Sequence, residues 1–312
     1  MKKKIALGTW SWGSGAAGGD QVFGNHLTAE NLKPIFDQAM KAGLNLWDTA
    51  AVYGMGSSET ILGEFVKQYP RQELILSTKF TPQIASDSEN AVEEMLLSSF
   101  ERLGTDYIDI YWIHNPADVE KWTPKLIPLL QSGKIKQVGV SNHNLEQIKR
   151  ANEILSTGGF RVSAVQNHYS LLYRSSEKAG ILDYCTENSI TFFSYMVLEQ
   201  GALTGRYNTE KPLPEGSGRG ETYNKMLPQL EELVSAMKEI GNRKGASVSQ
   251  IAMAWAIAKN TLPIIGVTKS KHIEEAVGAG KIVLTEEEIR QLENLADNTA
   301  VDTKGAWEAP MI

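Results

Sequence analysis

Apolar residues along this chain of 312 residues form two alternating patterns, short runs typical of buried β-strands and longer stretches with helical spacing. The short runs, such as LNLW and ELILS, are almost continuous, which indicates strands of a parallel sheet that is covered on both faces. We therefore predict eight strands, over residues 4–10, 44–50, 73–80, 107–114, 135–142, 162–168, 190–198 and 262–268.

Helical patterns fill the intervals between these strands. Thr28 is a suitable cap for a helix that ends at Gly43, because its hydroxyl can accept a hydrogen bond from an unpaired N–H of the first turn. By the same signals, one helix begins at Ser57 and another runs from Ser88 to Gly104. Further helices are predicted over 123–132, 145–157, 175–188, 228–259 (in two pieces), 271–278 and 286–296.

This alternation predicts an α/β fold, a closed (β/α)8 TIM barrel that forms a single domain over residues 1–312. The polar segment 206–226, rich in Gly and Pro, follows the seventh strand, and a loop of that length within a compact barrel is usually functional. In the C-terminal tail, 297–312, Trp307 is the only large anchor. The tail either folds over the barrel mouth or frays.

Composition and charge narrow the classes of function. The formal net charge is -6, so the chain carries no basic footprint for nucleic acid or an anionic membrane. No apolar segment has the length of a signal peptide or a membrane span, and we therefore expect a soluble, cytoplasmic protein. Cys185 is the only cysteine, and we interpret it as a packed thiol.

The segment GSGAAG, residues 13–18, matches the glycine pattern of a Rossmann dinucleotide site. That motif requires the glycines to open a helix, so that the N-terminus of the helix meets the pyrophosphate. Here residues 19–27 come before the first capped helix. We therefore interpret GSGAAGGD as a flexible loop after the first strand.

Polar and ionisable residues stand where the predicted strands end, which is where TIM barrels carry their chemistry. Each has a structural alternative: Asp48 could cap a turn, Lys79 could reach water, and His114 could be a satisfied core histidine. Their convergence on one mouth favours a functional role. In chain order the residues are Asp48 with Tyr53 after it, Lys79, His114, Ser141, Asn142, Gln166, Asn167 and Tyr195.

Asp48, Tyr53, Lys79 and His114 make chemical sense as a unit. A phenol has a pKa of about 10, and a nearby ammonium favours its ionised form while desolvation opposes it, so we expect a modest net fall in the pKa of Tyr53. Asp48 would keep Lys79 charged, and His114 would orient a substrate carbonyl. The result is a general acid for an oxygen that gains negative charge, and a nicotinamide cofactor would supply the hydride.

The sequence resembles the aldo-keto reductase superfamily over nearly its whole length. The similarity rests on LGTW, NLWDTAAVYG, STKF, YWIHNP, GVSN, VQNHYS, GALTG and PIIGVTKSKHIEEA. It implies a bacterial NADP-dependent reductase with Asp48, Tyr53, Lys79 and His114 as the catalytic set. It also implies cofactor contacts from Gly8, Thr9, Trp10, Ser141, Asn142, Gln166, Tyr195, Leu198, Gln200, Gly201, Leu203, Gly266, Val267, Thr268, Lys269, His272 and Glu275.

Some positions depart from the pattern of the family. The seventh strand reads SYMVL where many members have AYSPL, and Thr268 stands where many have an arginine or lysine. Lys269, Lys271 and His272 could still neutralise a 2′-phosphate, so we expect NADP (NADPH), with NAD as the alternative.

Aromatic residues near the strand ends are candidates for the substrate pocket. We predict that Trp10, Trp12 and Trp112 line it, although the first two could equally fill the core. No metal site is predicted, because His26, His143 and His168 lack metal-ligand spacing. The chain leaves the carbonyl substrate and the oligomeric state open.

Two other functions remain open. One is a nicotinamide-binding regulatory subunit on the same barrel with little turnover. The other is an aldolase in which Lys79 forms a Schiff base, a reading weakened by Asp48, which would keep the lysine protonated and unreactive. Reduction of an aldehyde or ketone with Tyr53 as general acid is the function that the residues favour.

Overall fold

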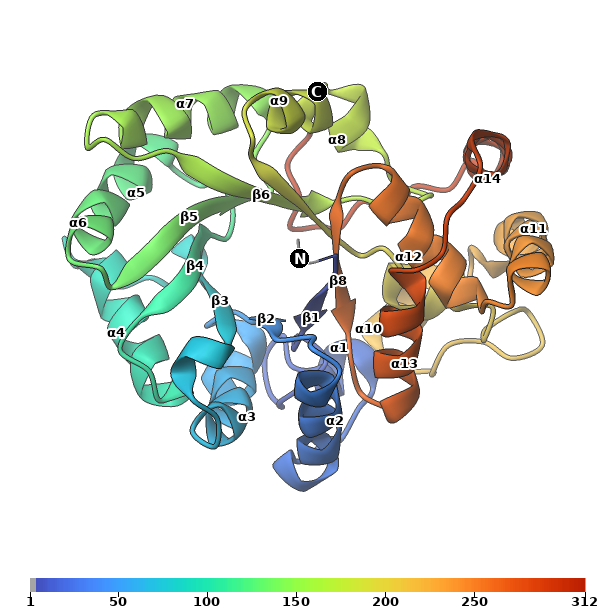
Figure 1. Ribbon diagram of the computed structural model, residues 1–312, viewed down its shortest axis with the longest axis horizontal. Helices are drawn as coiled ribbons and strands as arrows, with labels where there is room; N and C mark the ends of the chain where they lie inside the picture. The colour runs from blue at the N-terminus through green and yellow to red at the C-terminus, as the bar shows by residue number, and fades with distance from the viewer. Residues whose placement is uncertain (1–3, 312) are drawn as a thin grey trace.

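The computed structural model describes residues 4–311 and shows a closed barrel of eight parallel strands with helices around it (Figure 1). Neighbouring strands pair in chain order, and the last pairs with the first, which confirms the predicted (β/α)8 fold. The strands are β1 (Ala6–Gly8), β2 (Leu46–Asp48), β3 (Ile75–Phe80), β4 (Ile108–Ile113), β5 (Ile135–Ser141), β6 (Val162–His168), β7 (Thr191–Tyr195) and β8 (Leu262–Gly266).

Side chains inside the barrel change from apolar to polar along β2 and β6. Because successive side chains of a strand point to opposite faces, alternate residues share the interior. Leu46 lies in the inner apolar cluster, and Asp48, two residues later, is buried near the carboxyl ends. Ala164 and Gln166 repeat this order on β6. A packed apolar floor therefore supports a polar layer at one end of the barrel.

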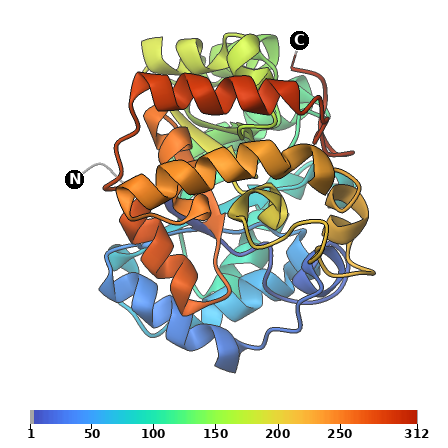
Figure 2. The same ribbon diagram turned by 90° about the vertical axis from the view of Figure 1, so that its right-hand side faces the viewer.

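The helices form an outer layer, and Figure 2 shows α14 running across one side of the barrel. Thr28 and Asn144 cap α2 and α7 with reciprocal side-chain bonds, as the sequence predicts for Thr28. The helices are α1 (Gly19–Phe23), α2 (Ala29–Lys41), α3 (Ser57–Val66), α4 (Ala91–Leu103), α5 (Val119–Trp122), α6 (Leu126–Gln131), α7 (Leu145–Ser156), α8 (Ser175–Lys178), α9 (Ile181–Glu187), α10 (Gly218–Tyr223), α11 (Leu227–Lys244), α12 (Val248–Ala258), α13 (Ser270–Ala279) and α14 (Glu286–Asn298).

Several helix boundaries differ from the prediction. The helix predicted from Ser88 begins at Ala91, because the Ser88 hydroxyl accepts from the N–H of Asn90 in a turn just before it. The helix predicted over 175–188 is divided at Gly180, whose φ is 73°. The short helix α1 begins at Gly19, within the predicted loop GSGAAGGD, and continues beyond it to Phe23.

The segment after β7 is more ordered than its composition suggests. It contains α10, and Leu213 and Tyr223 are buried in a small apolar cluster with Leu227 and Leu230. In the part of the chain that the structure describes, no helix combines the length and the hydrophobicity that crossing a bilayer requires. Cys185 is buried on α9, and burial raises the pKa of its thiol to about 12, so its predicted packing is confirmed.

Candidate active site

A cavity of about 1090 Å³ opens at the carboxyl ends of the strands. Its size exceeds that of an ordinary small-ligand pocket, which suits a ligand as long as a dinucleotide. Most of the residues singled out from the sequence line it. These are Gly8, Trp10, Asp48, Tyr53, His114, Ser141, Asn142, Gln166, Tyr195, Leu198, Gln200, Gly201, Gly266, Thr268, Lys269, His272 and Glu275.

Lys79 lies fully buried behind the cavity wall, between Asp48 and Tyr53. Its Nζ donates to Asp48 Oδ2 at 2.5 Å, to the carbonyl of Thr49 at 2.6 Å and to the Tyr53 hydroxyl at 3.5 Å. These three acceptors match the three protons of an ammonium group. The structure therefore joins the acid, the cation and the phenol that the sequence places on two strands and a loop.

The charge of Lys79 is stabilised by this arrangement. Burial alone would lower the pKa of Lys79, but the adjacent Asp48 carboxylate and Tyr53 raise it above its ordinary value. Asp48 is held in turn by the Ser77 hydroxyl at 2.7 Å and by the Gln166 amide at 3.2 Å. A charged Lys79 cannot form a Schiff base, which argues against the aldolase reading.

Tyr53 does not become the more acidic phenol that we expected. Burial raises its pKa above the ordinary value, and the opposing charge of Lys79 does not overcome that effect. The expected net fall in the pKa of Tyr53 is therefore wrong for this structure. The phenol stays protonated, which is the form that can donate a proton.

His114 faces Tyr53 across the cavity, with the two rings 5.9 Å apart. Its Nδ1 lies 2.8 Å from the hydroxyl of Thr81, and burial together with the charge of Lys79 holds its pKa well below the ordinary value. The imidazole is therefore neutral at neutral pH. The amide of Asn142 donates to the carbonyl of His114 at 2.9 Å, which ties β5 to the end of β4.

Trp112 and Trp12 are corrections to the predicted substrate pocket, because both are fully buried away from the cavity. Trp112 fills the barrel interior against Phe193, and its Nε1 donates to Ser77 Oγ at 2.5 Å. Trp12 packs on Trp47 and Phe65 in the outer core. Trp112 thus supports Asp48 through Ser77, and Trp12 packs in the outer core and donates to the carbonyl of Val267 at 2.7 Å.

Trp10 remains a pocket residue and belongs to an aromatic wall. Its ring is stacked on Tyr53 at 5.9 Å and meets the edges of Phe23 at 5.3 Å and Trp307 at 5.7 Å. All four residues line the cavity. Trp307 comes from the C-terminal tail, so the tail reaches the barrel mouth and contributes to the same wall.

Three predicted cofactor contacts lie beneath the cavity wall instead of on it. Thr9, Leu203 and Val267 are each fully buried and do not line the cavity. Thr9 accepts a hydrogen bond from Ser58, and the carbonyl of Val267 accepts one from Trp12. Their side chains support the wall, and the structure corrects their predicted role.

Two arginines of the segment after β7 also line the cavity, although the sequence reasoning did not single them out. Arg219 donates to the carbonyl of Gln200 at 3.2 Å, and its buried Nε has no hydrogen-bond partner within residues 4–311. Arg206 lies on the same side, with Lys269 and Lys271 before and at the start of α13. The sequence could have indicated both arginines, because they lie in the loop 206–226 that was already expected to be functional.

Nothing in the described part of the chain groups three or more His, Cys, Asp or Glu side chains in a way that could hold a metal ion. The polar groups of the cavity are instead a phenol, an imidazole, amides and, at one end, cations. This set suits an elongated organic ligand with an anionic end.

Known proteins were compared with the chain in sequence and in structure. The model of the aldo/keto reductase family matches residues 4–297. A chloroplastic pyridoxal reductase of Arabidopsis thaliana is 32% identical over 307 residues, 94% of this chain and 82% of that protein. The aldo-keto reductase yakc of Schizosaccharomyces pombe, whose name specifies NADP(+), is 31% identical over 312 residues, 93% of this chain and 89% of that protein.

A solved structure gives the same result. The crystal structure of an aldo-keto reductase from Klebsiella pneumoniae in complex with NADPH superposes with a TM-score of 0.73 at 26% identity, covering 94% of this chain and 90% of that one. The matches span the whole barrel, including the strand ends that carry the site. The chain therefore belongs to the aldo/keto reductase family, whose members are oxidoreductases that act on carbonyl and alcohol groups.

Proposed function

We propose that this protein reduces an aldehyde or ketone to an alcohol with NADPH, and that Tyr53 is the general acid. The observation that carries the proposal is the chain of contacts from Asp48 through Lys79 to the Tyr53 hydroxyl at the wall of a large cavity. The contacts among Asp48, Lys79, Tyr53 and His114, the four residues that the family resemblance implies for catalysis, support the proposal.

The cavity wall carries unpaired polar groups and a helix N-terminus that suit the phosphates of NADP(H). Arg219 Nε and Ser11 Oγ are buried, lack hydrogen-bond partners within residues 4–311, and belong to residues of the cavity wall. The N-terminus of α13, preceded by Lys269, offers backbone N–H groups that suit a phosphate. Lys271 and His272 would hold the 2′-phosphate, as the NADP-linked names of the relatives support. When bound, the nicotinamide supplies the hydride.

Tyr53 holds the proton that the reduction consumes. Because burial raises its pKa, the hydroxyl is neutral and ready to donate to an oxygen that gains negative charge. The Lys79 ammonium then stabilises the phenolate that remains, and Asp48 keeps that ammonium in place.

His114 orients the substrate in this proposal. We assign the proton to Nε2, with the Thr81 hydroxyl donating to Nδ1. A neutral imidazole then offers an N–H donor to the carbonyl oxygen without competing for the proton of Tyr53. Trp10 and Trp307 line the part of the cavity that would hold the substrate.

The test is a screen of NADPH oxidation over aldehydes and ketones of several classes, with pyridoxal included because a relative carries that name. We expect turnover by the wild-type protein and a loss of about 10³-fold in Tyr53→Phe, with NADPH binding unchanged by fluorescence titration. Undiminished turnover in Tyr53→Phe contradicts the proposed acid. Tight NADPH binding without turnover on any carbonyl favours the regulatory-subunit alternative.

A further inference from the structure

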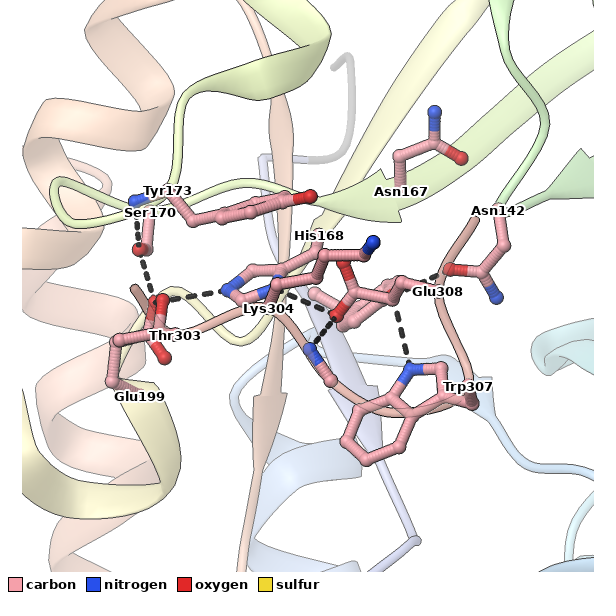
Figure 3. Close-up of polar contacts among 12 residues, drawn as sticks. Asn142, Asn167, His168, Ser170, Tyr173, Glu199, Thr303, Lys304, Trp307 and Glu308 are labelled. Carbon is pink, nitrogen blue, oxygen red and sulfur yellow. Dashed lines mark hydrogen bonds and ion pairs between the residues drawn. The ribbon is translucent and has the colours of Figure 1, made fainter. Parts of the chain in front are cut away.

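A buried polar cluster lies at the end of β6, where His168 meets Glu199 and Glu308 (Figure 3). His168, at the end of β6, is fully buried between two carboxylates from distant segments. Its Nε2 lies 2.9 Å from Glu199 Oε1, and its Nδ1 lies 2.9 Å from Glu308 Oε1. The cluster joins the barrel, the segment after β7 and the C-terminal tail.

Glu199 anchors the segment after β7. It is fully buried and accepts hydrogen bonds from Ser170, from Thr303 at 3.1 Å and from Tyr223 of α10 at 2.6 Å, besides the contact with His168. Its φ is 44° and that of Gln200 is 49°, a left-handed backbone that costs free energy in residues other than glycine. Strong side-chain bonds are therefore needed to hold this turn, which places Gln200 on the cavity wall.

Glu308 anchors the tail in the same way. Its side chain is buried, and Oε1 also accepts from the N–H of Gly305 at 3.0 Å. Trp307, the preceding residue, is 48% exposed and lines the cavity. Because about half of this side chain is exposed, its contacts with Trp10 and Tyr195 depend on the backbone position that the neighbouring Glu308 fixes.

Trp307 is also connected to the catalytic side. Its Nε1 donates to the Tyr195 hydroxyl at 3.3 Å, and Tyr195 donates to Asn142 Oδ1 at 2.5 Å. The amide of Asn142 donates to the carbonyl of His114. The position of the tail is thus linked through hydrogen bonds to the histidine that orients the carbonyl.

Only the doubly protonated ring can satisfy both carboxylates. A neutral imidazole donates from one nitrogen and would turn the lone pair of the other toward a carboxylate. Burial alone would lower the pKa of His168, but the charges of Glu199 and Glu308 raise it to about 9. The other titratable groups that face this ring are the phenols of Tyr173 and Tyr195, both stacked near it, which are neutral at these pH values.

We propose that His168 is a positioning residue whose imidazolium fastens the Glu199 turn and the Glu308 tail together, so that Trp307 is held at the substrate end of the cavity. The expected effect on substrate binding rests on the proposed reductase function, whereas the anchoring of the turn and the tail by His168 does not. Binding of the carbonyl substrate depends on the clamp formed by His168, Glu199 and Glu308, and the proton transfer from Tyr53 does not.

The sign of the pH dependence follows from the raised pKa. The clamp is fully present below the ordinary histidine pKa of about 6.5 and is lost as the pH rises through about 9. The KM for the carbonyl substrate is therefore flat at neutral pH and rises above pH 8 to 9, while kcat is not governed by this titration.

The first experiment uses the wild-type protein labelled with ¹⁵N-histidine. NMR at pH 7.5 should show His168 with both ring nitrogens protonated among the five histidines of the chain, assigned with His168→Gln. A neutral His168 at that pH overturns the proposal. This measurement needs neither NADPH nor a substrate, so its result is independent of the proposed function.

The second experiment compares Glu308→Gln with Lys304→Ala, an exposed residue of the same tail. Glu308→Gln keeps an oxygen acceptor but removes the charge, and we expect the KM to rise about tenfold, as for the loss of one charge-assisted hydrogen bond, with kcat changed less than about twofold. Hydrogen exchange of residues 299–311, measured without ligand, should be faster in Glu308→Gln than in Lys304→Ala.

Two outcomes overturn the inference. One is unchanged hydrogen exchange in the tail of Glu308→Gln, and the other is a roughly tenfold fall in kcat of this variant with KM unaltered. If the wild-type protein reduces no carbonyl, the proposed function fails, and the exchange and NMR measurements still decide whether the clamp exists. Tyr53→Phe should lower turnover about 10³-fold without changing exchange in the tail, which separates the two claims.

Discussion

His114 and His168 stand at the ends of two strands of one barrel, yet their pKa values move in opposite directions. Beside His114 is the ammonium of Lys79, which together with burial keeps the imidazole neutral. Beside His168 are two carboxylates, which overcome the effect of burial and keep it charged. Burial alone favours the neutral form of a histidine, and the sign of the neighbouring charge decides the outcome.

The two regions also use a buried cation differently. Lys79 is directed at a hydroxyl that faces the cavity, and in the proposed mechanism its charge stabilises the phenolate of Tyr53. His168 has both nitrogens occupied by carboxylates of other segments, so its charge serves to hold those segments together. Changes that remove either cation should therefore have separable effects.

Removing Lys79 should have the largest effect. Lys79→Met leaves Asp48 buried without its cation, and we expect a loss of about 3–5 kcal/mol in the free energy of unfolding. The pKa of His114 should rise at the same time, because a neighbouring positive charge is gone. Urea unfolding and histidine NMR measure both, with Lys149→Met, which removes a lysine from a surface ion pair with Glu146, as control. An unchanged stability would mean that the other donors to Asp48 compensate.

The pH dependence of the free energy of unfolding tests the charge of His168. Because folding raises the pKa of His168 from 6.5 to about 9, its contribution is fully present below pH 6.5 and lost as the pH rises through 9, on the order of 3 kcal/mol. Urea unfolding at pH 6.5 and pH 9.5 should show this decline in the wild-type protein and a much smaller one in His168→Gln. Parallel declines would refute the assignment.

Gly139→Ala tests the support beneath the catalytic side. A Cβ at Gly139 would lie 2.0 Å from the Trp112 ring, which fills the barrel and donates to Ser77. Overpacking should cost about 1–3 kcal/mol and lower activity by displacing Ser77 from Asp48. Thermal unfolding and kcat measure the two effects. Gly280→Ala is the control, because Gly280 has a φ of -63° and the nearest atom to an added Cβ is 3.5 Å away, which is ordinary contact.

Thr81→Val should have the smallest effect. It removes the hydroxyl beside Nδ1 of His114 while keeping the shape of the side chain. The hydrogen bond that orients the ring, which contributes about 1 kcal/mol, is then lost. We expect kcat/KM to fall about fivefold and the tail to keep its hydrogen-exchange pattern. A change in tail exchange would show that the hydrogen bonds from His114 through Asn142 and Tyr195 to the tail transmit the loss of the Thr81 hydroxyl.

The sequence determined the architecture and the list of strand-end residues. Alternating apolar runs and helical patterns are local signals, and closing eight strands in chain order brings their ends to one mouth. For this reason Asp48, Lys79 and His114 could be placed near one another from the sequence alone.

Only the tertiary structure decided what surrounds each group. His168 meets Glu199 and Glu308, which are 31 and 140 residues away along the chain. It also decided that Trp112 is buried in the barrel and that burial outweighs Lys79 in setting the pKa of Tyr53. The spacing of apolar residues along the chain predicts helices and strands. Desolvation and charge pairing instead depend on neighbouring residues that only the closed fold brings together.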